Sequence, residues 1–273
     1  MKKHLGFLIL LFLAIGCSRS DIMYRFADTM AVSKTDDYFD LSSAQKKELK
    51  KDIQTDLEKM RKELLPQVAK SLRSVETQVG KGPLPEDFVA DHVESAQTYF
   101  KKGTHYFSDT AVKLTASLDS TQISHFAKKV RKDIEKRQDP DEANKELNKR
   151  YRRSLELWIG GLSKDQKESL KKFQSSHPYP FHLQAQSREY VLQKFLESSK
   201  DPQTMKNFVQ QFTSDYESVR QPAYDQALQS YQKDFQKFLT GPFWSSLSTV
   251  QKEVFKKNLL TRAEELEKLS QRP

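Results

Sequence analysis

The clearest pattern in the chain is an apolar stripe that begins after Ser42. Apolar residues recur every three or four positions as far as Val79, with lysine, glutamate, aspartate and glutamine between them. This is the period of one face of an α-helix, so the pattern predicts an amphipathic helix over residues 42–79. Because Pro66 lies inside this run and lacks an amide hydrogen, we expect a kink there.

Similar stripes predict helices along most of the remaining chain. No segment alternates strictly between apolar and polar residues, and eight glycines are too few for a turn-rich β fold. We therefore predict an all-α fold, an elongated bundle of long, kinked amphipathic helices without a sheet. A second kink is expected at Pro222. The predicted ranges are 86–118, 119–137, 139–159, 163–175, 181–199, 201–238 and 248–269.

The first residues have the layout of a bacterial export signal. A basic head, Met1–His4, is followed by an apolar run, Leu5–Ile15, and then by Gly16 and Cys17. At about 1.5 Å per residue this run is too short to cross a hydrocarbon core about 30 Å thick. We therefore expect a signal that is removed, and no permanent transmembrane helix.

The end of this signal, Leu-Ala-Ile-Gly-Cys at residues 13–17, resembles the bacterial lipobox, with Ala14 where leucine is commonest. The resemblance implies cleavage before Cys17, a signal peptide over residues 1–16, and lipid on the cysteine. A free cysteine after an ordinary signal is the alternative. Two or more acyl chains anchor a protein durably. Ser18, in place of an aspartate that would favour the inner membrane, indicates the outer membrane, facing the periplasm.

The mature chain would form one helical domain over residues 17–273, with two lobes, 17–138 and 139–273, as the alternative. Cys17 is the only cysteine, so no disulfide can form within the chain and packing must supply the stability. The segment before Asp40 is short, which would keep the helical body close to its membrane.

Charge gives a broad indication of possible partners. The formal net charge is +9, and charged residues make up 30% of the chain. Most of these charges fit the solvated faces of long helices, but the excess also suits anionic partners such as phospholipid headgroups, lipopolysaccharide or acidic unfolded proteins. An exported location argues against nucleic acid. The densest basic run is a candidate polyanion patch, with a salt-bridged surface as the alternative: Lys149, Arg150, Arg152 and Arg153.

A pentapeptide with leucine first and glutamine last occurs four times. Its second residue, serine or aspartate, can cap the free amides of a helix start, and the glutamine can reach back to the N–H of that cap. The leucine can pack against the first turns. Four ordinary helix starts are the alternative explanation. The copies are Leu41-Ser42-x-x-Gln45, Leu118-Asp119-x-x-Gln122, Leu162-Ser163-x-x-Gln166 and Leu247-Ser248-x-x-Gln251.

The pentapeptides resemble the Leu-Ser/Thr-x-x-Gln signature of the Spy-type periplasmic chaperones, although nothing else in the chain does. This resemblance implies a basic, all-helical protein that holds unfolding clients on a concave surface. A wider resemblance is to an uncharacterised family of Gram-negative envelope lipoproteins, for which no activity is established. It implies a helical lipoprotein and no particular reaction. The motifs that carry it lie at residues 17–18, 23–25, 37–45, 63–66 and 152–166.

Residues that could carry chemistry form no recognised constellation. The sequence has no phosphate-binding loop, no H-E-x-x-H and no G-x-S-x-G. His177 and His182 flank a proline-containing aromatic loop, and Asp36, Asp37 and Asp40 precede the first pentapeptide. Each group could bind a metal, but a packed loop and a helix start that favours acids explain them better. We predict no catalytic residue, no metal and no cofactor.

These observations predict a non-enzymatic envelope lipoprotein, held to its membrane through lipid on Cys17. Its expected partners are unfolded proteins or anionic envelope polymers, bound in a chaperone-like way. The alternative is a structural or assembly factor that bridges the outer membrane to a specific partner. An enzyme of unknown type is the third hypothesis.

Overall fold

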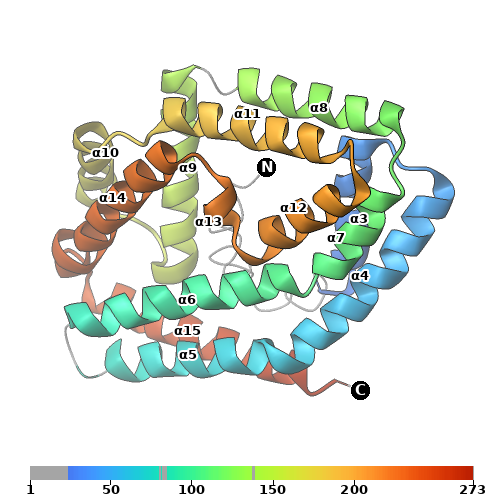
Figure 1. Cartoon of the computed structure of the whole chain (residues 1–273). Helices are drawn as coiled ribbons and strands as arrows, with labels where there is room; N and C mark the ends of the chain where they lie inside the picture. The colour runs from blue at the N-terminus through green and yellow to red at the C-terminus, as the bar shows by residue number, and fades with distance from the viewer. Residues whose placement is uncertain (1–23, 80, 82–84, 137–138, 273) are drawn as a thin grey trace.

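The computed structural model describes residues 24–79, 81, 85–136 and 139–272, and every regular element in these ranges is a helix (Figure 1). The all-α prediction is confirmed. The helices of the first half are α3 (Ala27–Phe39), α4 (Ser43–Glu63), α5 (Leu65–Val79), α6 (Glu86–His105), α7 (Ser108–Ala116) and α8 (Ser120–Glu135). Those of the second half are α9 (Pro140–Ile159), α10 (Lys164–Ser176), α11 (Phe181–Ser198), α12 (Pro202–Ser214), α13 (Tyr216–Val219), α14 (Pro222–Phe238), the π-helical turn η1 (Leu239–Phe243) and α15 (Thr249–Ser270).

The helices form the sides of a frame in Figure 1. α8 and α11 lie along one side, and α5, α6 and α15 lie along the opposite side. α4 closes the frame on the right of the view, and α9, α10 and α14 close it on the left. The shorter helices α12 and α13 lie within this outline. The shape of the frame therefore depends on packing contacts between helices that are far apart in the sequence, such as α5 and α15.

Prolines mark two of the breaks between helices, in different ways. The single helix expected over 42–79, with a kink at Pro66, is divided at Leu64 into α4 and α5, and Pro66 is the second residue of α5. The single kinked helix expected over 201–238 is wrong, since α12, α13 and α14 are separate. Pro222 is the first residue of α14, and it holds the preceding Gln221 in an extended conformation (φ −68°, ψ 131°).

The helix α3 was not predicted, because only a short connecting segment was expected before Asp40. It ends at Phe39. The next residue, Asp40, has a left-handed backbone (φ 52°, ψ 62°) that turns the chain, and its N–H donates to the carbonyl of Asp36. The helix expected over 86–118 is also interrupted, at Tyr106 and Phe107, between α6 and α7. A stripe of apolar residues predicts helix well, but it does not show where one helix gives way to the next.

Two hydrophobic clusters hold the frame together. One includes Ala69 of α5, Leu170 of α10 and Ala263 of α15, all fully buried. The other joins α3 and α8 to α11. The ring of Phe126 stacks on that of Phe39, with the ring centres 4.5 Å apart, and its centre lies 4.7 Å from the ring centre of Phe195. Each cluster draws on both halves of the chain, so the division into lobes 17–138 and 139–273 stays a prediction.

Arg61 fixes the end of the last helix to α4. Its side chain is 1% exposed, and its guanidinium donates to the carbonyls of Leu269 at 2.9 Å and Arg272 at 2.5 Å. Glu58 accepts from the same guanidinium at 2.6 Å. A cation at a helix C-terminus is favoured by the helix dipole. This buried contact joins the beginning and the end of the described chain.

Candidate functional site

The four pentapeptides lie at the starts of four helices. Ser42, Asp119, Ser163 and Ser248 are the N-caps of α4, α8, α10 and α15. In each helix the cap side chain accepts from the backbone N–H of the glutamine, and the glutamine side chain accepts from the N–H of the cap. The preceding leucines are buried or half-buried: Leu41, Leu118, Leu162 and Leu247. The structure further joins the four starts in two pairs.

The first amide pair consists of Gln45 and Gln122, at the starts of α4 and α8. The Nε2 of Gln45 donates to the Oε1 of Gln122 at 3.1 Å, and the Nε2 of Gln122 donates to the Oε1 of Gln45 at 2.8 Å. Each Nε2 also donates to a carbonyl that precedes the other cap, at Ser117 (2.8 Å) and Asp40 (3.0 Å). The two helix starts are therefore locked to each other.

The second amide pair, Gln166 and Gln251, repeats this arrangement at the starts of α10 and α15. The reciprocal amide hydrogen bonds measure 3.0 and 2.9 Å. The Nε2 of Gln166 donates to the carbonyl of Ser246 at 3.1 Å, and that of Gln251 donates to the carbonyl of Gly161 at 2.9 Å. Gln166 is 2% exposed, whereas Gln251 is half-buried, so the Gln166 side of this contact is shielded from water.

The pairing explains why glutamine stands at all four positions. Glutamate can serve in a capping box as well as glutamine, but a carboxylate has no N–H to donate to a partner. The chain has 37 acidic residues and uses none of them here. At the start of α9, by contrast, the cap Asp139 accepts from N–H groups of its own first turn, and Glu142 occupies the corresponding position. The consistent choice of glutamine was the sequence signal for the pairs.

A row of cations lies on one face of α9. Lys149 lies four residues after Lys145, and Arg152 and Arg153 lie three and four residues after Lys149, so all of these side chains neighbour Lys149 on the helix. Lys145 and Lys149 form exposed ion pairs with Glu142 (3.2 Å) and Glu146 (3.9 Å). The row lines an open hollow in the surface, and the residues around the hollow are Lys145, Asn148, Lys149, Arg152, Arg153 and Glu156.

The arginines of this row differ from the lysines. Within the described part of the chain, neither Arg152 nor Arg153 has a carboxylate partner, and the Nε of Arg152 is buried without a hydrogen-bond partner. Arg150, the remaining residue of the predicted polyanion patch, is half-buried and belongs to another face of α9. The structure thus joins three of the four predicted residues and adds Lys145.

Cations on the neighbouring helix α8 are engaged in ion pairs instead. Lys129 lies 2.6 Å from Asp37 of α3, and Arg131 lies 3.3 Å from Glu189 of α11. These two residues of α8 thus belong to a salt-bridged surface, which was the alternative to a polyanion patch. The arginines of α9 are better placed to receive an anionic group from outside.

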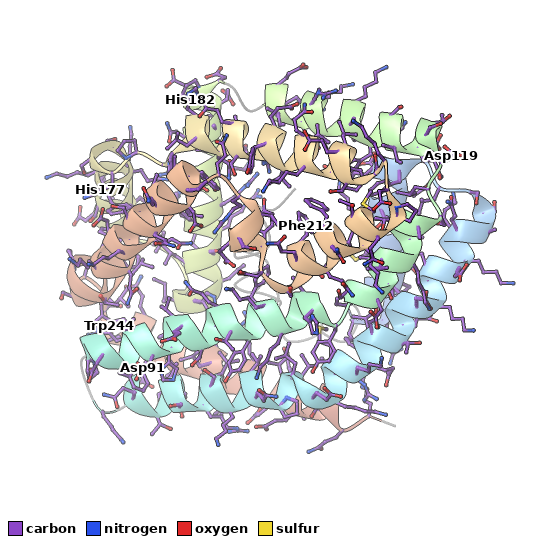
Figure 2. All side chains as sticks on the ribbon, in the orientation of Figure 1. Asp91, Asp119, His177, His182, Phe212 and Trp244 are labelled. Carbon is purple, nitrogen blue, oxygen red and sulfur yellow. The ribbon has the colours of Figure 1, made fainter. Side chains whose placement is uncertain are left out.

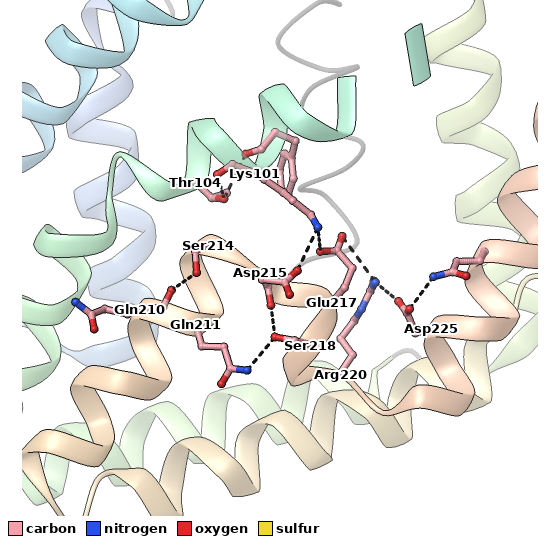
Figure 3. A network of polar contacts seen from close by, with 12 residues as sticks. Lys101, Thr104, Gln210, Gln211, Ser214, Asp215, Glu217, Ser218, Arg220 and Asp225 are labelled. Carbon is pink, nitrogen blue, oxygen red and sulfur yellow. Dashed lines mark hydrogen bonds and ion pairs between the residues drawn. The ribbon is translucent and has the colours of Figure 1, made fainter. Parts of the chain in front are cut away.

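A second polar region joins α6 to α13 (Figure 3). The Nζ of Lys101 lies 3.1 Å from both the Oδ1 of Asp215 and the Oε2 of Glu217. Arg220 continues this line of charges, 3.9 Å from Glu217 and hydrogen-bonded to Asp225. The hydrogen bond from Lys101 holds the pKa of Asp215 below its usual range. The hydrogen bonds to Glu217 and then Asp215 raise the pKa of Lys101.

Buried tyrosines surround Arg220 on its inner side. Its guanidinium lies 5.3 Å from the ring centre of Tyr216 and 5.7 Å from that of Tyr224. The hydroxyl groups of Tyr224 and Tyr179 are 2.7 Å apart, and Gln184 donates to both. Burial raises the pKa of all three tyrosines, which keeps the phenols neutral. The arrangement suits packing and hydrogen bonding rather than nucleophilic chemistry.

Three of the histidines and aspartates considered as metal ligands, His177, Asp36 and Asp37, have other contacts. His177 stacks on Phe173 at the end of α10, and His182 lies at the start of α11 (Figure 2). Asp36 accepts from the N–H of Leu41, and Asp37 pairs with lysines. Among the described residues, no three histidine, cysteine, aspartate or glutamate side chains are grouped as a metal site would require.

Cys17 and the predicted signal peptide lie outside the described residues. None of the helices that the structure describes is long and apolar enough to cross a membrane.

Fold and site together define an all-helical frame locked by two amide pairs, with a basic face on α9. The sequence pattern of a family of unknown function (DUF6279) matches residues 37–225, more than half of the chain. The chain belongs to this family, so the expected membership of an uncharacterised family is confirmed. The match includes the first three pentapeptides and ends before the fourth. No curated protein and no solved structure matches the chain.

Proposed function

We propose that this protein is a lipid-anchored lipoprotein of the outer membrane, facing the periplasm, with a non-enzymatic, chaperone-like binding role. Its anchor is the lipid on Cys17, as the lipobox-like ending of the signal indicates. Its ligands are unfolded polypeptides with acidic and apolar stretches, and anionic envelope polymers share the chemistry that this surface recognises. The resemblance of the pentapeptides to the Spy-type signature supports the same role.

The observation that carries this proposal is the outward face of α9. Arg152 and Arg153 have no carboxylate partner in the described chain, and Lys149 adds a third positive charge. Leu157, one turn beyond Arg153, is 43% exposed. Cations beside an exposed apolar side chain fit a ligand that combines acidic and apolar groups, and an unfolded polypeptide offers both.

The end of this face is held firmly by α15. Asn258 donates to the carbonyls of Leu157 at 3.2 Å and Trp158 at 2.8 Å, and Trp158 is buried beneath. Gln251 of the second amide pair donates to the carbonyl of Gly161, just after α9. Because the backbone under the face is fixed, binding would require little ordering of the protein itself.

The test is whether residues 18–273 suppress the aggregation of unfolding clients at low molar ratio. We expect suppression, and we expect the double variant Arg152→Gln/Arg153→Gln to need about fivefold more protein, because a loss of about 1 kcal/mol weakens binding by that factor. The matched control is Lys171→Gln/Lys172→Gln, which removes two exposed cations from the adjacent α10. No suppression across several acidic and basic clients would refute the chaperone-like role.

The anchor needs its own measurement. The mass of the protein purified from membranes should include a diacylglyceryl group and an amide-linked acyl chain on Cys17, and Cys17→Ser should release the protein from the membrane. Crosslinking in cells then separates the two binding roles. Many weak partners fit the chaperone-like role, whereas one dominant partner would favour the bridging factor.

A further inference from the structure

The outer face of α3 carries two exposed apolar side chains close to the predicted anchor. Phe26 is 56% exposed and Met30 is 52% exposed. Phe26 is the N-cap residue of α3, and the N–H of Met30 donates to its carbonyl, so the two side chains lie one turn apart on one face. The opposite face is packed into the core through Val32 and Phe39. Leaving both side chains in water forgoes the free energy of burying them, and a natural surface normally limits such pairs.

No other described helix exposes two large apolar residues in this way. The remaining exposed examples, Val93, Leu157 and Val250, lie on α6, α9 and α15. In Figure 1, α3 lies beside α4 and behind α7. The exposed fractions of Phe26 and Met30 show that no other described element covers these two side chains.

The polar residues of this face are arranged as at a membrane surface. Thr29 and Ser33 are small and exposed, while the cations Arg25 and Lys34 lie at the two ends of the face. The acid in the first turn, Asp28, is turned inward, where it is 6% exposed and accepts from Gln54 at 2.6 Å. A face with apolar residues in the middle and cations at its ends is typical of contact with anionic headgroups.

Asp37, at the far end of the helix, does not disturb this arrangement. It pairs with Lys34 at 3.2 Å and with Lys129 of α8 at 2.6 Å, and these lysines hold its pKa below the usual range. Two lysines face this one carboxylate, so this end of the face keeps a net positive charge.

The length of chain between anchor and helix makes contact with the bilayer possible. Phe26 lies nine positions after Cys17, and even fully extended this stretch spans only about 30 Å. Lipid on Cys17 would therefore restrict α3 to a thin layer next to the membrane. At this short distance a modest affinity for the surface suffices, because the effective concentration is high.

We propose that the outer face of α3 (Arg25, Phe26, Thr29, Met30, Ser33 and Lys34) rests on the headgroups of the phospholipid leaflet that holds the lipid of Cys17. This inference rests on the lipid anchor of the proposed function, but not on its chaperone-like role. Phe26 and Met30 enter the boundary between headgroups and acyl chains. The contact orients the frame, so that it does not swing freely on its anchor.

The experiment uses the acylated full-length protein with one added cysteine. Because Cys17 carries lipid, Ser33→Cys provides the only free thiol for an environment-sensitive fluorophore, while Phe26 and Met30 stay in place. The protein is reconstituted into vesicles of phosphatidylethanolamine and phosphatidylglycerol that contain a nitroxide-labelled lipid. We expect a blue shift and strong quenching at position 33, and neither effect for the control Val250→Cys, whose side chain is 72% exposed.

A second variant tests the two apolar residues directly. Adding Phe26→Ser and Met30→Ser to the labelled Ser33→Cys protein should remove most of the quenching, while the acyl chains keep the protein in the vesicle fraction. Equal quenching at positions 33 and 250, or quenching that the two serines leave unchanged, would overturn the proposal. If mass spectrometry instead shows Cys17 without lipid, the proposed anchor fails and this proposal fails with it.

Discussion

The amide pairs and the charged contact between α6 and α13 solve the same problem by different means. Both join helices that are distant in sequence through polar side chains. Gln166 is 2% exposed and its pair is neutral, whereas the side chain of Lys101 is 44% exposed and that of Asp215 is 50% exposed. Neutral amides can be buried if every N–H and carbonyl has a partner, but exposed charges are screened by water and salt.

This difference indicates which contact determines the fold. Each amide pair fixes the starts of two helices, and a helix start can neither slide nor turn once its cap and its partner are set. The contact of Lys101 with Asp215 and Glu217 joins α6 to the four-residue α13, the shortest described α-helix. We therefore expect the amide pairs to stabilise the whole frame and the charged contact to stabilise only the position of α13.

The largest effect should come from Gln166→Glu. Glutamate keeps the local capping box, but it removes the two donated hydrogen bonds and places a charge in a buried site against the Oε1 of Gln251. We expect a loss of about 3 kcal/mol in the free energy of unfolding, measured by urea denaturation.

The matched control is Glu142→Gln at the same helix position of α9, where the cap lies outside both pairs. It should change the stability by less than about 0.5 kcal/mol. If Gln166→Glu lowered the free energy of unfolding by as little, the paired helix starts would be ordinary capping boxes whose glutamines do not stabilise each other.

A double-mutant cycle should show that the coupling lies within each pair. Gln166→Ala and Gln251→Ala should interact with a coupling free energy of about 1 kcal/mol, because either change alone already breaks the shared hydrogen bonds. Gln166→Ala and Gln45→Ala belong to different pairs and should be additive within about 0.5 kcal/mol. Additivity within the pair, or coupling of similar size between the pairs, would contradict this arrangement.

Breaking the charged contact should cost less and should depend on pH and salt. Asp215→Asn should destabilise the protein by less than about 1 kcal/mol at low ionic strength, and about 1 M NaCl should remove most of the difference. Urea denaturation at both salt concentrations provides the measurement, with Gln166→Glu as the reference that salt should affect little.

The pH range of this effect follows from the two pKa shifts. The folded state lowers the pKa of Asp215, so its contribution is present above the unfolded value of about 4 and is lost as the pH falls through the lowered folded value. The folded state raises the pKa of Lys101, so its contribution is present below about 10.4 and is lost as the pH rises through the raised value. Asp215→Asn should therefore matter between about pH 4 and pH 10. A difference that persists at pH 2 would show that the carboxylate charge is not responsible.

Local patterns predicted most of the helices and all four caps, because both depend on residues only a few positions apart. The ends of α9 at Asp139 and Gly160 follow from a cap and a glycine that the sequence displays. α3 was not predicted because its apolar residues are unevenly spaced, with none between Val32 and Tyr38. The helix is stabilised by packing against α4 and α8.

The candidate site was less accessible to sequence reasoning. The run at residues 149–153 indicated a basic patch, but only the helical geometry separates Arg150 from Arg152 and Arg153. The partners of Gln45 and Gln166 lie 77 and 85 residues away, so the pairs depend on the tertiary fold. Arg61 likewise has its partners at the other end of the chain.

The smallest effect should come from exchanging the type of cap within the first amide pair. This pair has Ser42 and Asp119 as caps, whereas both caps of the second pair are serines. In the unaltered protein the backbone N of Gln122 lies 2.9 Å from the Oδ1 of Asp119. Asp119→Ser keeps an acceptor for this N–H and loses only the favourable interaction of a carboxylate with the helix dipole. We expect a loss of about 0.5 kcal/mol in urea denaturation, against about 1 kcal/mol for Asp119→Ala, which has no acceptor. A serine variant as unstable as the alanine variant would show that the first pair, unlike the second, needs the charge of its cap.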